Sequence, residues 1–101
     1  MEIIQPVSAD EAAGLARSIP LWKLETKSIE RPFRFKDFRQ AMAFVNKVAD
    51  AAERRDHHPD IFISWNKVTL TLSTHKIGGL SRVDFDLAAE IDGLAAASGG
   101  A

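Results

Sequence analysis

Hydrophobic residues recur at helical spacing in three segments of the chain, residues 9–19, 37–55 and 82–94. This spacing is typical of helices with one apolar face. At the start of each segment, or directly before it, stands a residue whose side chain can cap a helix, with an acid or amide three positions later, which is the spacing of a capping box. The three pairs are Ser8 with Glu11, Asp37 with Gln40, and Ser81 with Asp84. We therefore predict three amphipathic helices, the first of which ends at Pro20.

The middle helix is the longest, and its apolar positions form a broad stripe. These positions are Phe38, Ala41, Met42, Val45, Val48, Ala49 and Ala52. We expect this stripe to face the protein core, because an amphipathic helix buries its apolar face. The opposite face carries charged side chains at Arg39, Lys47, Asp50 and Arg54, and we interpret it as a face in contact with solvent.

Four shorter segments, residues 22–26, 29–35, 61–65 and 68–73, have the composition and alternation of strands. In the last of them, apolar side chains alternate with hydroxyl side chains, which predicts one face toward the core and one wetter face. Pro32 has no N–H to donate to a neighbouring strand. The second strand is therefore expected to be an edge strand or to contain a bulge at this residue.

The predicted order of elements is α-β-β-α-β-β-α. Strands that follow one another through short turns, such as the turn expected at Asn66 and Lys67, pair antiparallel. Three amphipathic helices on one face of a four-stranded antiparallel sheet make a two-layer α+β fold. The length of 101 residues predicts one domain over residues 1–101, with residues 1–7 and 95–101 expected to be flexible.

Composition excludes several classes of function. Lys and Arg total 13 against 14 Asp and Glu, so the sequence predicts no nucleic-acid partner. The absence of cysteine excludes disulfides, thiolate nucleophiles and zinc sites built on sulfur. The first residues lack the basic and apolar regions of a signal peptide, and no apolar run reaches the length of about 20 residues that spans a membrane. We expect a cytoplasmic protein without a membrane partner.

The three histidines are predicted to meet at one corner of the sheet. His57 and His58 lie between the middle helix and the third strand, and His75 follows the fourth strand. If the last two strands form a hairpin, the start of one lies beside the end of the other. Imidazole has a pKa of about 6.5, so it exchanges protons near neutral pH. The cluster is a candidate acid–base site, although single histidines are also common on surfaces and in hydrogen-bonded cores.

Two other kinds of site could be built from the residues at this corner. Glu53, Asp56 and Asp84 could join the histidines around a metal ion, but adjacent histidines point in different directions and no helical H-x-x-x-H pair is present. Ser73 could suggest a Ser-His-Asp hydrolase, but the chain has no G-x-S-x-G segment. Asp84 also has an ordinary structural role as an acid in the first turn of a helix. We predict neither a metal site nor a cofactor.

The residues around the histidines resemble the pterin-4a-carbinolamine dehydratases. The matching stretches are Glu53-Arg54-Arg55-Asp56-His57-His58-Pro59-Asp60, Trp65-Asn66-Lys67-Val68, Leu72-Ser73-Thr74-His75, Gly79-Leu80-Ser81 with Asp84, and upstream Phe33-Arg34-Phe35-Lys36-Asp37-Phe38 and Trp22. The resemblance covers about residues 8–94. It implies the same fold as the periodicity does.

The resemblance also implies an activity and its residues. Such an enzyme eliminates water from a 4a-hydroxytetrahydropterin to give a quinonoid dihydropterin, a step of tetrahydrobiopterin recycling, without a cofactor. His57, His58 and His75 are implied as the acid–base groups. Asp56 and the segment Ser73-Thr74-His75-Lys76 are implied to contact the pterin together with His57 and His58. Glu53 and Asp84 are similar to flanking acids that orient the site.

The partners implied by the resemblance are a pterin substrate and further copies of the chain, as a homodimer or homotetramer. A functional link to a pterin-dependent aromatic amino acid hydroxylase is also implied. The alternative is a non-catalytic module on the same fold, which binds a pterin or helps a transcription factor to dimerise.

Overall fold

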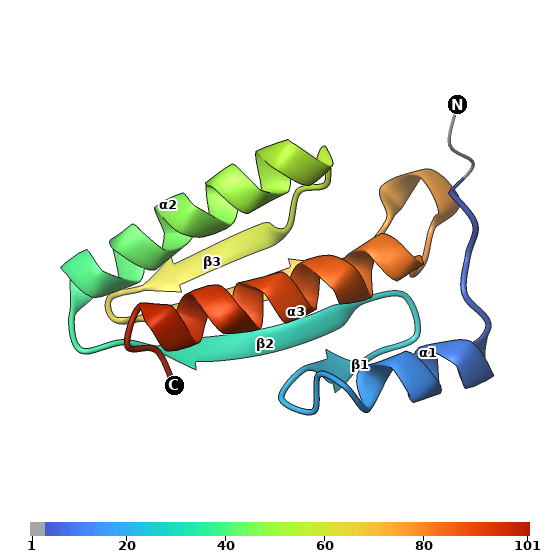
Figure 1. Cartoon of the computed structure of the whole chain (residues 1–101), viewed down its shortest axis with the longest axis horizontal. Coiled ribbons are helices and arrows are strands. Elements are labelled where there is room, and N and C mark those ends of the chain that lie inside the picture. The colour runs from blue at the N-terminus through green and yellow to red at the C-terminus, as the bar shows by residue number, and fades with distance from the viewer. Residues whose placement is uncertain (1–3) are drawn as a thin grey trace.

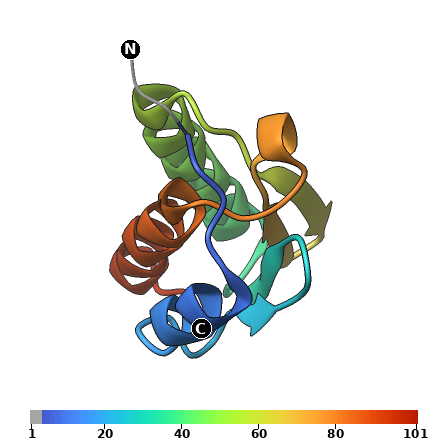
Figure 2. The same cartoon turned by 90° about the vertical axis from the view of Figure 1, so that its right-hand side faces the viewer.

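The computed structural model describes residues 4–101 and has the predicted two-layer α+β architecture. The elements are α1 (Ala9–Ala16), β1 (Lys23–Leu24), β2 (Ile29–Arg34), α2 (Phe38–Arg55), β3 (Asp60–Ser64), β4 (Lys67–Leu72), the 3₁₀ helix η1 (His75–Ile77) and α3 (Arg82–Ala97). The four strands form one antiparallel sheet in the order β1-β2-β4-β3. Figures 1 and 2 show the helices on one face of this sheet. No helix within residues 4–101 is both long and apolar enough to cross a membrane.

The core lies between the helices and the inner face of β2 and β4. Val68, Leu70 and Leu72 are fully buried, which confirms the alternation predicted for this strand. The register pairs Leu72 with Ile29 and Val68 with Phe33, so apolar side chains of both strands share one face. Residues directly opposite one another in an antiparallel pair point to the same side of the sheet. The predicted pattern of β4 therefore sets which face of the sheet receives the helices.

The buried face of α2 differs from the predicted stripe. Its buried residues are Ala41, Phe44, Val48, Ala51 and Ala52. Phe38, which was expected inside, is 49% exposed, because it stands at the first position of the helix. Phe44, which the stripe omitted, packs against the rings of Phe33 and Phe35 at centroid distances of 5.0 and 4.8 Å. Aromatic packing with Phe33 of β2 and with Phe35, just after that strand, thus selects the face of α2 that is buried.

Three strand predictions need correction. β1 has only two paired residues, and the turn before β4 consists of Trp65 and Asn66 rather than Asn66 and Lys67. The Asn66 side chain donates a 2.9 Å hydrogen bond to the carbonyl of Phe35, which holds this turn against the end of β2. Pro32 lies in an interior strand with continuous register to β4, and not in an edge strand or bulge. Because β1 pairs only with Ile29 and Glu30 of β2, the missing N–H of Pro32 removes no hydrogen bond between these two strands.

Both ends of the described chain make defined backbone contacts. Helix α3 continues to Ala97, and Ala101 exchanges two hydrogen bonds of 2.9 and 3.0 Å with Arg34 of β2. Near the other end, the Val7 N–H donates to the carbonyl of Leu80 at 3.0 Å. These contacts fall in segments that were expected to be flexible. Residues 1–3 of the first segment lie outside the described residues.

A buried cation is held on the core side of the sheet. Arg31 occupies an inward position of β2, and its side chain is 8% exposed. Its guanidinium lies 2.6 Å from the Asp92 carboxylate and 4.2 Å from the centre of the Phe33 ring. The indole N–H of Trp22 donates to the same Asp92 oxygen at 2.7 Å. Asp92 therefore joins β2, the segment before β1 and helix α3.

Replacing this acid should destabilise the fold. Asp92→Ala leaves the Arg31 charge and the Trp22 N–H without their partner, so we expect the free energy of unfolding to fall by about 1–3 kcal/mol. Urea unfolding followed by circular dichroism measures this change. Glu25→Ala is the matched control, since it removes an exposed ion pair with Lys23 and should change stability by less than about 0.5 kcal/mol. Equal effects of the two substitutions would contradict the role given to Asp92.

Candidate active site

The corner that carries the first two histidines is shaped by the end of α2. Asp56 caps this helix in the left-handed conformation, with φ of 49°, and its N–H donates to backbone carbonyls of the last turn. The His57 N–H donates to the Ala52 carbonyl at 3.0 Å. This arrangement ends the helix and reverses the direction of the chain. Pro59 follows and cannot continue a helix. The local sequence therefore turns His57 back toward α3.

Two arginines at the end of α2 bind one acid of α3. Arg54 and Arg55 contact the Glu90 carboxylate at 2.5 and 2.8 Å. The hydrogen bond from Arg55, followed by that from Arg54, lowers the pKa of Glu90 despite the opposing effect of burial. The helix end that positions the histidine corner is thus held to α3 by charge as well as by packing.

His57 is held by a buried acid. Its Nε2 atom lies 2.5 Å from Oδ1 of Asp84, which stands in the first turn of α3 and is completely buried. The His57 side chain is 12% exposed. A histidine whose ring is oriented by a carboxylate, with one edge near solvent, has the arrangement of a general acid or base. The two residues are 27 positions apart in the sequence.

The second oxygen of Asp84 is bound by two further donors. Oδ2 accepts hydrogen bonds from the Thr74 hydroxyl at 2.8 Å and from the Ser81 N–H at 3.0 Å. The hydroxyls of Thr74 and Ser81 lie 2.7 Å apart. Thr74 is only 3% exposed, and Ser81 is 2% exposed. Asp84, Thr74, Ser81 and His57 therefore form one buried polar network.

The other two histidines lie at the surface. Nε2 of His58 is 2.6 Å from Oε2 of Glu53, and the two side chains are 57% and 76% exposed. His75 is exposed at the start of η1. The two predicted flanking acids thus bind different histidines: Glu53 binds His58 and Asp84 binds His57. Within residues 4–101, no three His, Asp or Glu side chains gather in a set that could hold a metal ion.

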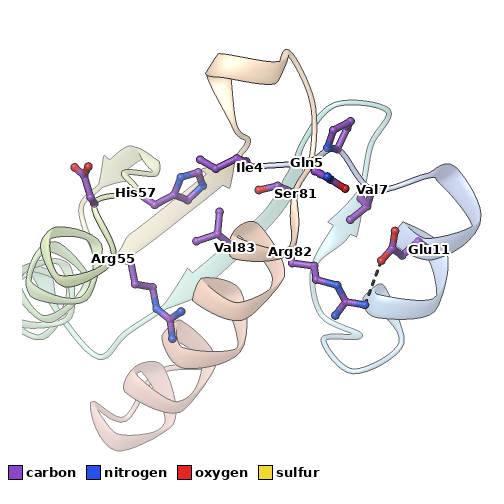
Figure 3. Close-up of a pocket in the computed structure, with 11 residues that line it drawn as sticks. Ile4, Gln5, Val7, Glu11, Arg55, His57, Ser81, Arg82 and Val83 are labelled. Atoms are coloured by element: carbon purple, nitrogen blue, oxygen red, sulfur yellow. Dashed lines mark hydrogen bonds and ion pairs between the residues drawn. The ribbon is translucent and has the colours of Figure 1, made fainter. Parts of the chain in front are cut away.

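A cavity of about 440 Å³ opens beside His57. Its walls come from Arg55, Asp56 and His57 at the helix corner, from residues 81–83 at the start of α3, from Glu11 of α1, and from residues 4–7. Figure 3 shows the His57 ring directed from the corner toward Ile4 and Ser81. Both arginines of these walls already have acidic partners. Arg82 binds Glu11 at 3.1 Å, and Arg55 binds Glu90 at 2.8 Å.

The predicted site residues divide into three groups. His57, Thr74 and Asp84 form the buried network, and Asp56 lines the cavity beside it. Glu53 and His58 form an exposed pair at the end of α2. Ser73, His75 and Lys76 do not line the cavity: Ser73 is half-buried, and the other two are exposed.

Sequence reasoning missed two parts of the site. Ser81 was predicted only as a helix cap, although its pairing with Asp84 was a sign that it lies beside that acid. The contribution of residues 4–7 to the cavity wall left no such sign, because it depends on how the chain before α1 crosses the start of α3.

Residues 5–94 match a family model described as pterin 4 alpha carbinolamine dehydratase. The chain belongs to this family. A relative from Acidobacterium capsulatum, provisionally named pterin-4-alpha-carbinolamine dehydratase, is 58% identical over 77 residues, which are 76% of this chain and 84% of the relative. A relative with the same provisional name from Rubrobacter xylanophilus is 42% identical over 92 residues, 90% of this chain and 86% of the relative.

Two solved structures share the fold. One is titled a transcriptional coactivator/pterin dehydratase from Brucella melitensis; it has a TM-score of 0.87 at 32% identity and covers 90% of this chain and 99% of its own. The other is titled a pterin dehydratase-like protein that is a RuBisCO assembly factor in the alpha-carboxysome. It has a TM-score of 0.61 at 25% identity and covers 73% of this chain and 86% of its own.

The adjacent histidines should differ in their importance for stability. His57→Ala removes a hydrogen-bond partner from the buried Asp84 carboxylate, so we expect it to lower the free energy of unfolding by about 1–3 kcal/mol. His58→Ala is the matched control, because it removes an exposed pair and should change stability by less than about 0.5 kcal/mol. Urea titration of both variants measures the difference. Two equally stable variants would contradict the importance of the His57–Asp84 contact for stability.

Proposed function

We propose that the protein is a 4a-hydroxytetrahydropterin dehydratase that works by histidine general acid–base catalysis. The observation that carries the proposal is the His57 ring, held by the buried Asp84 carboxylate at the wall of a cavity. A volume of about 440 Å³ lies in the range typical of small-molecule sites. Membership in the pterin 4 alpha carbinolamine dehydratase family supports a pterin as the substrate.

The reaction needs two proton transfers and no change of oxidation state. The C4a–O bond breaks as the N5 lone pair forms a double bond to C4a. One acid protonates the leaving hydroxyl, so that it departs as water, and one base removes the proton from N5. The product is a quinonoid dihydropterin. Since the substrate's own nitrogen expels the hydroxyl, histidines near neutral pH can supply both transfers.

The three histidines have different positions relative to the cavity. His57 is the one that lines it, so it is our choice for the group that faces the reacting edge of the pterin. His58 and His75 do not line this cavity and are exposed, and in our proposal they supply the second proton-transfer group when the pterin is bound. Asp56, which lines the cavity beside His57, contacts the pterin.

Replacing the histidines should separate catalysis from folding. We expect His58→Ala and His75→Ala each to lower the turnover of a 4a-hydroxytetrahydropterin by roughly 10²-fold, because each removes an acid–base group. The double variant should lose less than the product of the two single effects, since groups that act together are not additive. Steady-state kinetics measures these losses, and treatment with a chelator should leave the wild-type rate unchanged.

Arg39→Ala, on the charged face of α2, is the control for a surface substitution away from the site. It should leave turnover unchanged. Circular dichroism reports whether each histidine variant is folded. Wild-type turnover in a folded double variant would exclude His58 and His75 from the reaction. A wild-type protein that binds the pterin without converting it would support the non-catalytic alternative.

In a cell, such an enzyme would act in the cytoplasm and support tetrahydrobiopterin recycling. Its substrate carries a hydroxyl at C4a, which an oxygenating reaction must supply. A pterin-dependent aromatic amino acid hydroxylase is the partner reaction that fits this chemistry.

A second copy of the chain is the partner proposed for the sheet edge. β3 is an edge strand, and its Ile61 and Phe62 side chains are 38% and 66% exposed. An exposed apolar edge strand is prone to pair with another strand unless it is covered. A two-fold contact between β3 strands would cover both residues and give a homodimer, from which a homotetramer can be built.

Light scattering should therefore report a mass that is a multiple of 11.1 kDa. Phe62→Lys places a charge at the proposed contact and should shift the protein toward monomer. Lys23→Ala, at the opposite edge of the sheet in β1, is the control and should not change the mass. A wild-type monomer at micromolar concentration, or a Phe62 variant with unchanged mass, would contradict this interface.

A further inference from the structure

We propose that Thr74 and Ser81 are positioning residues that hold His57 with a proton on Nε2, so that its Nδ1 atom exchanges the proton with the substrate. This inference rests on the proposed dehydratase function. It differs from the expectation that Thr74 contacts the pterin. It depends on the donors around Asp84, the direction of the hydroxyl chain and the tautomer of His57.

The surroundings of Asp84 favour a negative charge on its carboxylate. Its Oδ2 atom accepts from the Ser81 N–H, which can only donate, and from the Thr74 hydroxyl. Oδ1 faces His57. A carboxylate that accepts two hydrogen bonds at one oxygen, here Oδ2, is stabilised in its ionised form. Asp84 is completely buried, so these partners replace the water that the charge has lost.

The hydroxyls of Thr74 and Ser81 form a chain with one direction. Thr74 has one hydroxyl proton, and it is donated to Asp84. In the 2.7 Å contact between the two hydroxyls, Ser81 must therefore be the donor and Thr74 the acceptor. The chain runs from Ser81 to Thr74 to Asp84. Because Thr74 is 3% exposed and its proton is committed, it has no donor left for a ligand.

The charge on Asp84 determines which nitrogen of His57 carries a proton. An ionised Asp84 has no proton to give, so the 2.5 Å contact requires the Nε2 atom of His57 to be the donor. When the ring is neutral, Nδ1 then carries the lone pair. When the ring is charged, Nδ1 carries the proton that it can release. Proton exchange with the substrate therefore takes place at Nδ1, on a residue that lines the cavity.

The backbone around Thr74 explains why these hydroxyls can orient the acid. The Thr74 N–H donates to the Gly79 carbonyl at 2.7 Å, which closes the loop that contains η1. Ser81 is the N-cap of α3, so its position is set by the start of that helix. The network thus connects the end of β4, the start of α3 and the corner after α2. Loss of the Thr74 hydroxyl would leave the Ser81 N–H as the remaining donor to Oδ2, and loss of the Ser81 hydroxyl would remove the partner that orients Thr74. Each change would hold the Asp84 carboxylate, and with it the His57 ring, less firmly.

The proton assignment can be tested without any activity. In protein labelled with ¹⁵N-histidine, nitrogen shifts report which ring nitrogen of His57 is protonated, at a pH where the ring is neutral. We expect the Nε2–H form, with a proton that exchanges slowly with water because it is shared with Asp84. The Nδ1–H form in the wild-type protein would overturn the inference, even if the protein proves to be a dehydratase.

Variants of Thr74 test the positioning role. Thr74→Val keeps the branched shape but removes the hydroxyl, so the His57 Nε2 proton should exchange faster with water. We expect kcat to fall by about 10-fold with little change in KM. Losses of this size are typical when a group that orients a functional histidine through a hydrogen bond is removed, as at metal-bound histidines. Thr74→Ser restores the hydroxyl and should restore both readouts. Ser81→Ala should give a smaller loss of the same kind.

The outcomes separate this inference from the proposed function. If Thr74 contacts the pterin instead, Thr74→Val raises KM and leaves the His57 proton unchanged, which overturns the positioning role. If the wild-type protein has no dehydratase activity, the proposed function fails, but the exchange of the His57 proton still decides the inference. Should the valine variant not fold, the comparison of Thr74→Ser and Ser81→Ala with wild type decides it. Unchanged proton exchange in Ser81→Ala would then overturn the role of that hydroxyl.

Discussion

The buried carboxylate of Asp84 is the constraint on which the candidate site depends. A charge that is removed from water destabilises a fold unless it is paired and hydrogen-bonded. Here the partners are His57, Thr74 and Ser81, and they come from three separate segments. The same contacts that make the buried charge tolerable therefore also fix the end of β4, the start of α3 and the orientation of one histidine. Stability and candidate chemistry share one set of atoms.

The rest of the fold keeps these three segments in place. Glu90 binds Arg54 and Arg55, which holds the end of α2 beside α3. Because its pKa is lowered in the folded protein, Glu90 stabilises the fold above the ordinary carboxyl pKa, and this contribution is lost as the pH falls through the lowered value. Farther along α3, Asp92 joins the helix to Arg31 and Trp22. Asp84, Glu90 and Asp92 of this one helix thus each bind a different part of the structure.

Family membership defines the scaffold, while the chemistry depends on particular side chains. Among the solved structures that share this fold, one is titled a coactivator/pterin dehydratase and another a RuBisCO assembly factor. The same layers can therefore serve different purposes. What favours catalysis in this chain is a titratable ring, held by a buried acid, at the wall of a cavity that is large enough for a small molecule.

Local patterns in the sequence determined the order of the elements, the three helix caps and the inward face of β4, because these depend on neighbours within a few residues. They also pointed to Asp84 and to all three histidines. Only the tertiary structure decided that Phe44 rather than Phe38 faces the core, since that choice depends on the rings of Phe33 and Phe35. It likewise placed His57 beside the cavity and His58 at the surface. The two adjacent histidines differ in exposure because His57 contacts Asp84, an acid 27 positions away in the sequence, whereas His58 pairs with an exposed acid of the same helix end. Contacts between such distant residues arise from packing and not from local sequence.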